Sequence, residues 1–446
     1  MNIPMKIGLN RIIFENAMLK KLKSNIIGLK EKGAFHVVAG SFLIKFVSFF
    51  GSVFLVRLLN KSEYGILSYY ENFSSYLTIL MGLGLASGLQ RYVVLADSYD
   101  EKKSTYMYAI KRGSLVNIFI VIFGMFYIAL FPHPEVFASN RVIGYLLVLC
   151  IPFLFILNAS LSTIRALFKN KLYSYVSFIS SSLMVISRVI GAGLSGAELS
   201  VTFRLVIDII VAFSCFYLII NRFFSKCNNI RLEKQFTSSL NRYSLQIMLT
   251  DGLWAVFMLN DLFLLGQFTG SETAIADYKI ASVIPANLSI LTSAIGIFIA
   301  PYFTKKENER DYAWVKKKFK TVLLLTSLIM GIAVLACFLF AEYLITFIYG
   351  EAYISTVSTM RLLLMASFIN NGVRATIANI LSSIGKQKIN LIAAGIGIVL
   401  QVALNIIFIP QYGTTAVALT SCVVYFIMTM LLMVAWHVEI RRSFNK

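Results

Sequence analysis

Positive charge in this chain is concentrated in every second gap between long uncharged stretches. If the chain is divided into about twelve apolar helices of membrane-spanning length, 32 of the 41 Lys and Arg residues fall in the alternate segments 1–33, 91–113, 165–171, 222–242, 304–320, 385–388 and 439–446. The segments between them, together with the adjoining outer ends of the helices, hold six, and three lie deeper inside the helices. Basic residues that flank membrane spans stay on the cytoplasmic side. The distribution therefore predicts a multi-pass membrane protein with both termini in the cytoplasm, and it explains the net charge of +20 without nucleic acid.

The uncharged stretches are long enough to cross a bilayer. A hydrocarbon core of about 30 Å needs roughly 20 apolar residues per helix. Residues 113–131, 142–164, 280–304 and 321–341 contain no Asp, Glu, Lys or Arg, and neither does the whole stretch 389–438. With 58% hydrophobic residues and a mean hydropathy of +0.76, the chain lies far outside the composition of soluble proteins.

We predict an all-α polytopic membrane protein with two pseudo-symmetric six-helix bundles around a central cavity. The predicted spans are 34–59, 66–90, 113–131, 142–164, 172–193, 199–221, 243–268, 274–303, 320–348, 355–384, 389–409 and 414–438. They divide into an N-terminal lobe over 34–221 and a C-terminal lobe over 243–438. A cytoplasmic linker over 222–242 joins the lobes, and a cytoplasmic tail follows over 439–446.

The first 33 residues are polar and basic, and they lack the apolar core and cleavage site of a signal peptide. Apolar residues from Ile12 to Leu29 recur every three to four positions, with lysines on the other faces. This pattern predicts an amphipathic helix on the cytoplasmic leaflet, where each basic residue contributes about 1 kcal/mol against anionic lipid. A solvated basic tail is the alternative.

Cysteine and histidine offer no sign of a metal or redox site. The five cysteines are scattered, mostly within predicted spans, and the three histidines are isolated. We interpret the cysteines as apolar packing residues. We therefore predict no metal and no cofactor.

Weak internal similarity indicates a duplication. Lys169-Asn170-Lys171 precedes the predicted fifth helix, and Lys386-Gln387-Lys388 precedes the eleventh, at an offset of 217 residues. At that offset Arg188 corresponds to Asn405. Since six crossings bring the chain back to its starting side, the two halves would be parallel repeats related by an axis along the membrane normal.

Several loop motifs resemble one family. They are Arg57-Leu-Leu-Asn-Lys-Ser-Glu-Tyr-Gly65 after the first helix, Asn260-Asp261 with Tyr278, Ser383-Ile-Gly-Lys-Gln-Lys388, and Asn405 followed by Ile409-Pro-Gln-Tyr-Gly413. On these motifs the chain resembles the polysaccharide flippases, of the O-antigen and teichuronic acid exporter (Wzx-like) type, of the multidrug/oligosaccharidyl-lipid/polysaccharide exporter superfamily. That family usually continues the last motif with Gly-Ala-Ala, where this chain has Thr414-Thr415-Ala416.

The resemblance implies a transporter of the bacterial cytoplasmic (inner) membrane and not an enzyme. Two lobes would rock around a central cavity and turn an oligosaccharide on a polyprenyl pyrophosphate carrier from the cytoplasmic to the outer leaflet. No catalytic residues are expected. The partners would be the lipid-linked oligosaccharide, membrane lipids, H+ or Na+ as a coupling ion, and the glycan polymerase machinery.

Intramembrane cations are the candidate substrate-binding residues, because a charge at a helix centre costs roughly 2.5–3.5 kcal/mol on insertion scales. Lys45, Arg188 and Arg374 lie within predicted spans, and Arg91 lies at the inner end of the second. We hypothesise that the first three form a site for the anionic headgroup and that Arg91 receives pyrophosphate at the entrance. The alternative is that each side chain reaches the membrane surface or pairs with a nearby acid.

Among the acids, Asp251 is the candidate for ion coupling. It lies about eight residues into the predicted seventh helix, with no basic residue within one turn. Asp208 follows Arg204 by four positions, which predicts a structural pair. Asp261 and Glu71 lie nearer the outer ends of their helices, where we expect them to be solvated.

Three other functions compete with the flippase. A cation-coupled drug or metabolite antiporter of the same superfamily would share the fold, but a carboxylate would be expected in the first helix, where this chain has Lys45. A peptidoglycan-precursor flippase commonly has extra C-terminal helices. A glycan polymerase or glycosyltransferase usually needs a sizeable outer loop, and the predicted outer loops are short.

Overall fold

The computed structural model describes residues 34–131 and 134–444, and these residues form helices without any β-strand. The first half contains α2 (Ala34–Leu58), α3 (Lys61–Ile79), η1 (Met81–Gly84), α4 (Leu85–Leu95), α5 (Tyr99–Leu130), α6 (Glu135–Ala138), α7 (Arg141–Leu149), α8 (Ile151–Ala166) and α9 (Asn170–Phe223). The second half contains α10 (Lys234–Thr269), α11 (Glu272–Asn287), α12 (Ser289–Asn308), α13 (Tyr312–Leu339), α14 (Ala341–Tyr349), η2 (Glu351–Thr356), α15 (Val357–Ser367), η3 (Phe368–Arg374), α16 (Ala375–Ser383) and α17 (Gln387–Phe444). Both η1 and η2 are 3-10 helices, and η3 is a π-helix.

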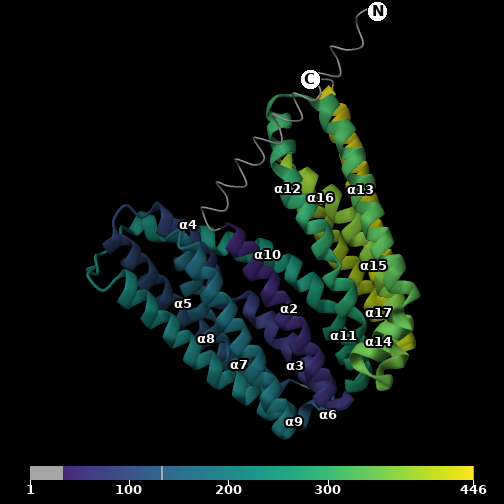
Figure 1. The fold of residues 1–446 in the computed structure, drawn as a ribbon, viewed down its shortest axis with the longest axis horizontal. Helices are drawn as coiled ribbons and strands as arrows, with labels where there is room; N and C mark the ends of the chain where they lie inside the picture. The colour runs from purple at the N-terminus through teal and green to yellow at the C-terminus, as the bar shows by residue number, and fades with distance from the viewer. Residues whose placement is uncertain (1–33, 132–133, 445–446) are drawn as a thin grey trace, which may run out of the picture.

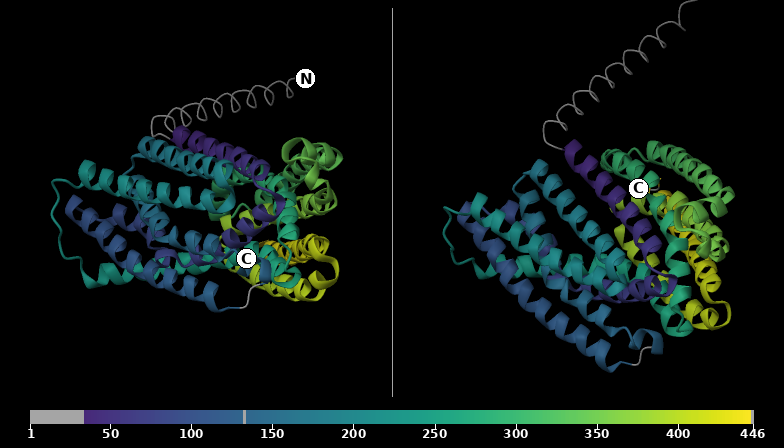
Figure 2. Two further views of the ribbon diagram at one scale, coloured as in Figure 1. Left: turned by 90° about the horizontal axis from the view of Figure 1, so that it is seen from below. Right: turned by 60° about the horizontal axis from the view of Figure 1, so that its bottom comes forward.

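The helices form two lobes that meet at one end and diverge toward the other (Figure 1). Helices α2 to α9 make the N-terminal lobe, and α11 to α17 make the C-terminal lobe. The lobes meet near α6 and α14, and they are farthest apart at the end where the C-terminus lies. In the turned views the purple-to-teal helices and the green-to-yellow helices lie toward opposite sides of the molecule and overlap in the middle (Figure 2). The charge distribution predicts that the open end faces the cytoplasm, and this orientation stays a prediction.

The long helices α9 and α17 carry the clearest trace of duplication. Non-helical backbone interrupts α9 at Ser195 and Gly196, and α17 at Gly413. The two glycines lie 217 residues apart (413 − 196), which is the offset between the Lys-Asn-Lys and Lys-Gln-Lys motifs. Both glycines have a positive φ, of +76° and +54°, which a side chain would disfavour. The same sharp return between two helices therefore occurs at equivalent positions of both lobes.

Among the described residues, nine helices are long and apolar enough to cross a membrane, or ten if the bent pair α3–α4 is one span. Two of these nine stretches, in α9 and α17, are 54 and 53 residues long and are broken near the middle. Because a crossing takes roughly 20 residues, each is long enough for two. The total of twelve crossings stays a prediction.

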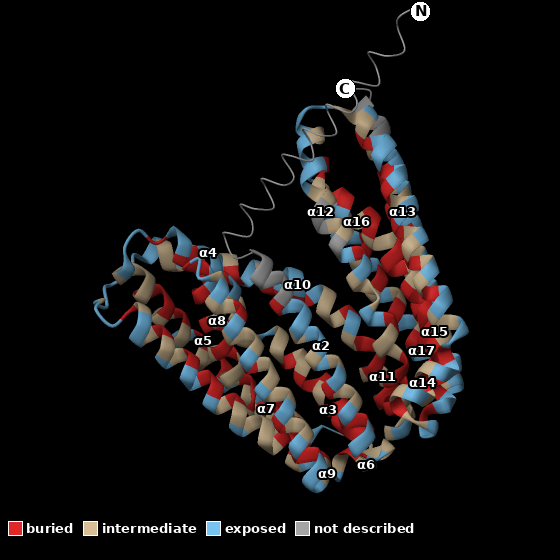
Figure 3. Ribbon diagram, in the orientation of Figure 1, coloured by how far each residue is buried: buried red, intermediate tan, exposed pale blue. Residues whose placement is uncertain are grey.

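Burial follows the pattern of a membrane protein. Buried residues lie where the helices of a lobe face one another, and exposed residues line the outer faces (Figure 3). Large apolar side chains such as Phe119, Phe126, Leu324 and Leu328 are more than half exposed. Exposed apolar surface of this extent is suited to lipid and not to water.

Helix α10 connects the two lobes by packing on both. Its first half belongs to the N-terminal lobe, because Leu240 is buried in the core of that lobe and Gly88 of α4 lies against Ser244. A Cβ at Gly88 would lie 2.0 Å from the Ser244 hydroxyl, so a larger residue there would force this side chain to move. Its second half packs on α17, where Phe257 is buried with Val424 and Met428.

The bend between α3 and α4 is built into the backbone. Gly82, Leu83 and Gly84 all have a positive φ, and the two helices are bent by 44°. Asn117 of α5 accepts a hydrogen bond from the Gly82 amide at 2.9 Å, which satisfies a donor that the break would leave unpaired. The bend is therefore held by a buried side chain of the neighbouring helix.

Most predicted spans coincide with helices, but two helices begin much earlier than predicted. Helix α5 starts at Tyr99 instead of residue 113, and α10 starts at Lys234, inside the segment predicted as the linker. These extensions are polar, so hydropathy does not reveal them. Ser98 is the N-cap of α5, and its hydroxyl accepts a hydrogen bond from the Glu101 amide, which fixes where the helix begins. The predicted amphipathic segment 1–33 lies outside the described residues.

Candidate functional site

A cavity of about 370 Å³ lies against the C-terminal lobe, near the junction with the N-terminal lobe. Its wall comes from α10, α11, α15, η3 and α17, and α3 of the other lobe contributes Asn72. The lining combines aromatic rings, amides and hydroxyls with two charged residues, Asp261 and Lys279. A wall of this composition can bind a polar, partly ring-shaped molecule.

Asp261 is the most heavily hydrogen-bonded acid of the cavity. Its carboxylate accepts hydrogen bonds from Tyr278 (3.0 Å), Gln401 (2.9 Å), Asn405 (2.8 Å) and Ser421 (3.0 Å). The side chain is buried, at 7% exposure, so the expectation that Asp261 is solvated was wrong. Its position near the end of the helix indicated exposure, but α17, which is distant in the sequence, covers it.

The break in α17 makes the Asp261 site possible. Gly413 lies between Asn405 and Ser421, so the two halves of α17 fold back and reach the same carboxylate. The side-chain amide oxygens of Gln401 and Asn405 are buried beside this carboxylate, and they accept no hydrogen bond from the described residues. A carboxylate with neighbouring carbonyl oxygens can hold a proton or a hard cation such as Na+. Among the described residues, no group of three or more His, Cys, Asp or Glu could hold a metal ion.

Arg374 lies at the end of the π-helical segment η3, beside the cavity. Its guanidinium carbon is 4.7 Å from the ring centre of Trp254 and 6.0 Å from that of Tyr425, and both rings line the cavity. Its Nε donates to Asn370 at 2.6 Å. Such π-helical turns are frequent at functional sites, and cation–π contacts hold a charge where no acid neutralises it. Among the described residues, no carboxylate forms an ion pair with Arg374.

Arg188 instead forms an ion pair in the N-terminal lobe. Its guanidinium binds Glu71 of α3, and Arg204 approaches the same carboxylate at 3.9 Å. The expectation that Glu71 is solvated was therefore wrong. The predicted pair of Arg204 with Asp208 is confirmed, at 3.5 Å. Arg188 therefore pairs with an acid, which was the alternative to headgroup binding, although 19% of its side chain stays exposed.

Lys279 is a cavity residue that the sequence analysis missed. It was counted among the outer segments, but it lines the cavity from α11. Its charge also interacts favourably with Glu71 of the N-terminal lobe. The sequence signal for Lys279 was its position directly after Tyr278, which belongs to the Asn260-Asp261 motif described above.

The other three predicted residues lie on separate helices. Lys45 is exposed on α2, and Asp251 is exposed on α10, one turn before Trp254. Arg91 is exposed on α4, with its guanidinium 4.6 Å from the ring centre of Tyr243. Among the described residues, no hydrogen bond or ion pair joins any two of the five predicted site residues.

The closed end between the lobes is held by residues of the Arg57–Gly65 motif. Arg57 donates to the carbonyls of Phe347 and Ile348, and so caps the C-terminus of α14. Lys61 forms an ion pair with Asp277 at 2.7 Å, and Ser62 donates to Glu272 at 3.2 Å. We call this set, Arg57, Lys61 and Ser62 with Phe347, Ile348, Asp277 and Glu272, the interlobe clasp. It joins α2 and α3 to α11 and α14.

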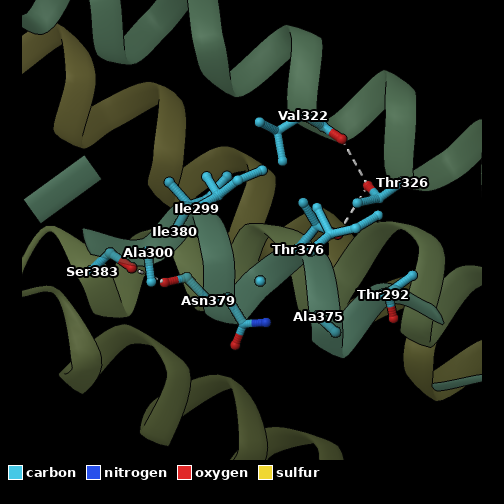
Figure 4. Close-up of a pocket in the computed structure, with 12 residues that line it drawn as sticks. Thr292, Ile299, Ala300, Val322, Thr326, Ala375, Thr376, Asn379, Ile380 and Ser383 are labelled. Carbon is cyan, nitrogen blue, oxygen red and sulfur yellow. Dashed lines mark hydrogen bonds between the residues drawn. The ribbon is translucent and has the colours of Figure 1, made fainter. Parts of the chain in front are cut away.

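A smaller cavity lies within the C-terminal lobe between α12, α13 and α16 (Figure 4). Its volume of about 20 Å³ is enough for one water molecule. Thr376 donates to Thr326 at 3.0 Å, and Thr326 donates to the Val322 carbonyl at 2.9 Å. We interpret it as a packing defect between hydrogen-bonded helices.

Comparisons with known proteins agree with this architecture. The model of a family described as polysaccharide biosynthesis protein matches residues 54–358, more than half of the chain. An uncharacterized membrane protein of Methanocaldococcus jannaschii is 22% identical over 432 residues, covering 89% of this chain and 82% of that protein. An inward-facing multidrug resistance transporter of the MATE family, in the MOP superfamily, superposes with a TM-score of 0.73 and 12% identity, covering 90% of this chain and 96% of that one. The lipid II flippase MurJ, in an inward closed conformation, gives a TM-score of 0.64 and 19% identity, covering 89% and 87%.

Proposed function

We propose that this chain, which belongs to the polysaccharide biosynthesis protein family, moves an oligosaccharide on a polyprenyl pyrophosphate carrier across the cytoplasmic membrane. The movement would be from the cytoplasmic to the outer leaflet, by alternating access. The observation that carries the proposal is the cavity near the lobe junction, where cationic groups lie beside aromatic rings and amides. The MOP-superfamily fold supports a transporter or flippase.

The cavity suits the two polar parts of such a cargo. Lys279 lines it, and Arg374 lies behind the rings of Trp254 and Tyr425. Both cations attract the pyrophosphate electrostatically, and the Lys279 ammonium, which lines the cavity, can also donate hydrogen bonds to it. The amides of Asn72 and Asn370 can donate to and accept from sugar hydroxyls, while the aromatic faces pack on the apolar faces of the rings.

The different states of the two ends of the molecule support alternating access. The lobes are apart at the end assigned to the cytoplasm, and the interlobe clasp closes the opposite end. Breaking the clasp would let the outer end open while the inner end closes. A ligand shifts the equilibrium between two conformations only if it binds one of them more tightly. The cargo would therefore have to bind the cavity more tightly when the inner end is closed than when it is open.

Ion coupling would use a carboxylate on α10. Asp251, the predicted residue, is exposed one turn before Trp254 and so lies on the side of α10 that carries part of the cavity wall. Asp261 is the second candidate, because it is buried among neutral donors and spare carbonyl oxygens. Proton or Na+ binding at either residue would change the net charge of the cavity by one.

A cation-coupled drug antiporter is the second candidate function. A buried acid and the Trp254 and Tyr425 rings are a combination that also binds organic cations. The Arg374 guanidinium behind these rings favours an anion instead. Uptake of a cationic dye by vesicles that contain the protein, with no flipping of a lipid-linked oligosaccharide, would decide for the antiporter.

The test is flipping of a fluorescent polyprenyl-pyrophosphate oligosaccharide by the reconstituted full-length protein. Lys279→Ala should lower the rate about tenfold or more, because a hydrogen bond to a charged group contributes about 1.5–3 kcal/mol. Arg374→Ala should lower the rate as well, because it removes the second positive charge beside the cavity. Lys45→Ala tests whether the exposed face of α2 also contacts cargo. Lys305→Ala is the matched control, since its side chain is 74% exposed and lies outside the cavity. Wild-type rates in both cavity variants would refute the site.

A further inference from the structure

A second sizeable cavity lies at the junction of the N-terminal lobe with the crossing helix α10. Its volume is about 340 Å³, and it is enclosed by η1, α4, α5 and α10. Arg112 of α5 and Arg242 of α10 both line it, together with Asn241 and a wall of leucines. It shares no lining residue with the cavity that contains Asp261.

The polar groups of this cavity are arranged around Tyr108 of α5. The Tyr108 hydroxyl accepts hydrogen bonds from Arg112 at 3.0 Å and from the Asn241 amide at 2.8 Å. Tyr108 does not itself line the cavity, but by accepting both hydrogen bonds it holds Arg112 and Asn241 in place. Arg112 keeps further N–H groups, and Arg242 adds another guanidinium. The cavity therefore presents several donors and a charge of about +2 to any molecule that enters it.

No carboxylate lines this cavity. The nearest acids on α10 are Glu233 and Asp251, each nine residues from Arg242, or about 13 Å along the helix. On α5 the nearest is Glu101, eleven residues before Arg112. Two neighbouring arginines without an acid repel each other, and a bound anion removes that cost.

The position of the cavity points to a lipid as the source of the anion. Arg112 and Arg242 each directly precede a predicted span, 113–131 and 243–268, which places them at the depth of lipid phosphates. Leu83, Leu85 and Leu245 form the adjacent wall, and Leu245 is 42% exposed. We propose that this cavity binds the phosphate headgroup of an anionic phospholipid of the cytoplasmic leaflet, with the beginning of an acyl chain against the leucines.

Binding there would act on the structure, because the cavity spans the junction between the N-terminal lobe and the helix that crosses to the other lobe. It joins α5 of the N-terminal lobe to the first half of α10, directly beside the bend at Gly82–Gly84. A phosphate held by both arginines ties α10 to the N-terminal lobe. Anionic lipid would then stabilise the arrangement in which the first half of α10 stays packed on this lobe. The site is independent of the cargo proposal.

The experiment measures lipid binding to the purified full-length protein in neutral detergent, by native mass spectrometry and thermal unfolding. The probes are phosphatidylglycerol, phosphatidylcholine, a polyprenyl phosphate and inorganic pyrophosphate. The Arg112→Ala/Arg242→Ala variant should bind phosphatidylglycerol about tenfold or more weakly, since each lost contact to a charged group is worth about a factor of ten. Tyr108→Phe should weaken binding to a smaller extent.

The matched control is Lys317→Ala/Lys318→Ala, which removes two exposed positive charges from α13 of the other lobe. Its phosphatidylglycerol affinity should stay within twofold of wild type. The charge-conserving Arg112→Lys/Arg242→Lys variant should retain part of the affinity and shows whether the alanine variant has merely misfolded. Equal loss in both alanine variants would overturn the site, and so would equal binding of phosphatidylcholine. Binding of only polyprenyl phosphate or of soluble pyrophosphate would overturn the assignment to a phospholipid.

Discussion

Replacing Lys61 with alanine removes the charged centre of the interlobe clasp. The Lys61 ammonium pairs with Asp277 at 2.7 Å, reaches the Ala352 carbonyl at 3.5 Å and lies 5.4 Å from the ring centre of Tyr353. All three partners belong to the C-terminal lobe, whereas Lys61 begins α3 of the N-terminal lobe. The substitution therefore weakens the contact between the lobes without disturbing the packing within either.

The size of the effect follows from the exposure of the pair. The Lys61 and Asp277 side chains are 25% and 20% exposed. An exposed ion pair contributes about 0.2–1 kcal/mol, whereas removing one partner of a buried pair costs about 3–5 kcal/mol. A value of about 2 kcal/mol lies between these limits and equals a change of roughly thirtyfold in the ratio of the two states. Lys61→Ala should shift the protein toward the outward-open state by that factor.

Spin labels at the open ends of the lobes measure this shift. Lys171 at the start of α9 and Lys317 near the start of α13 are exposed, so cysteines there can be labelled in a background without the native cysteines. Double electron–electron resonance should show a shorter distance gaining population in Lys61→Ala, because the inner end closes as the outer end opens. Lys305→Ala serves as the control for loss of a positive charge.

Two results would refute this reasoning. One is an unchanged distance distribution in Lys61→Ala. The other concerns the charge-reversed double variant Lys61→Asp/Asp277→Lys. If Lys61→Asp alone changes the distance distribution and the double variant does not restore it, the ion pair is not the cause. Restoration is expected because a salt bridge depends on opposite charges and tolerates their exchange when the two backbones stay in place.

Three further predictions follow from the structure. Asp261→Asn places an amide among four donors, so it should destabilise the protein by about 2–3 kcal/mol. It should also remove any dependence of thermal unfolding on Na+ or pH that arises at this site. If that dependence remains, Asp261 does not bind the ion. Gly65→Ala puts a Cβ 1.9 Å from the Glu272 carbonyl oxygen and should separate α3 from α11 in the spin-label assay, whereas Gly193→Ala, whose nearest contact would be 3.8 Å, should not. The Trp314 amide and then Lys306 hold the pKa of Asp311, the N-cap of α13, below its usual value. Its contribution to stability is therefore complete above about pH 4 and is lost as pH falls through the lowered pKa, so melting temperatures of wild type and Asp311→Ala should differ at pH 7 and converge in acid.

Local patterns were sufficient where both partners lie on one helix. The Arg204–Asp208 pair was predicted from a spacing of four residues and is present. The offset of 217 residues, found in two short basic motifs, also relates the breaks at Gly196 and Gly413. In each case the relevant geometry is that of the helix or of the repeat, which spacing along the chain determines.

Spacing was insufficient where the partner comes from a distant helix. Arg188 meets Glu71 across 117 residues, and Asp261 meets Asn405 across 144. Neither separation leaves a periodic signal in a single sequence. For that reason the pairing of Arg188 was one of two open alternatives in the sequence, Asp261 and Glu71 were expected to be solvated, and Lys279 was not a candidate.

The sequence by itself determined that the chain is a bundle of apolar helices, where most of those helices lie, and which end of the bundle carries the positive charge. These properties depend on the transfer of each segment from water to lipid, which every segment undergoes largely on its own. Only the tertiary structure decided which intramembrane charges are neutralised and which face a cavity. That outcome depends on which side chains several helices bring within hydrogen-bonding distance, because an ion in a medium of low polarity is stable only beside its partner.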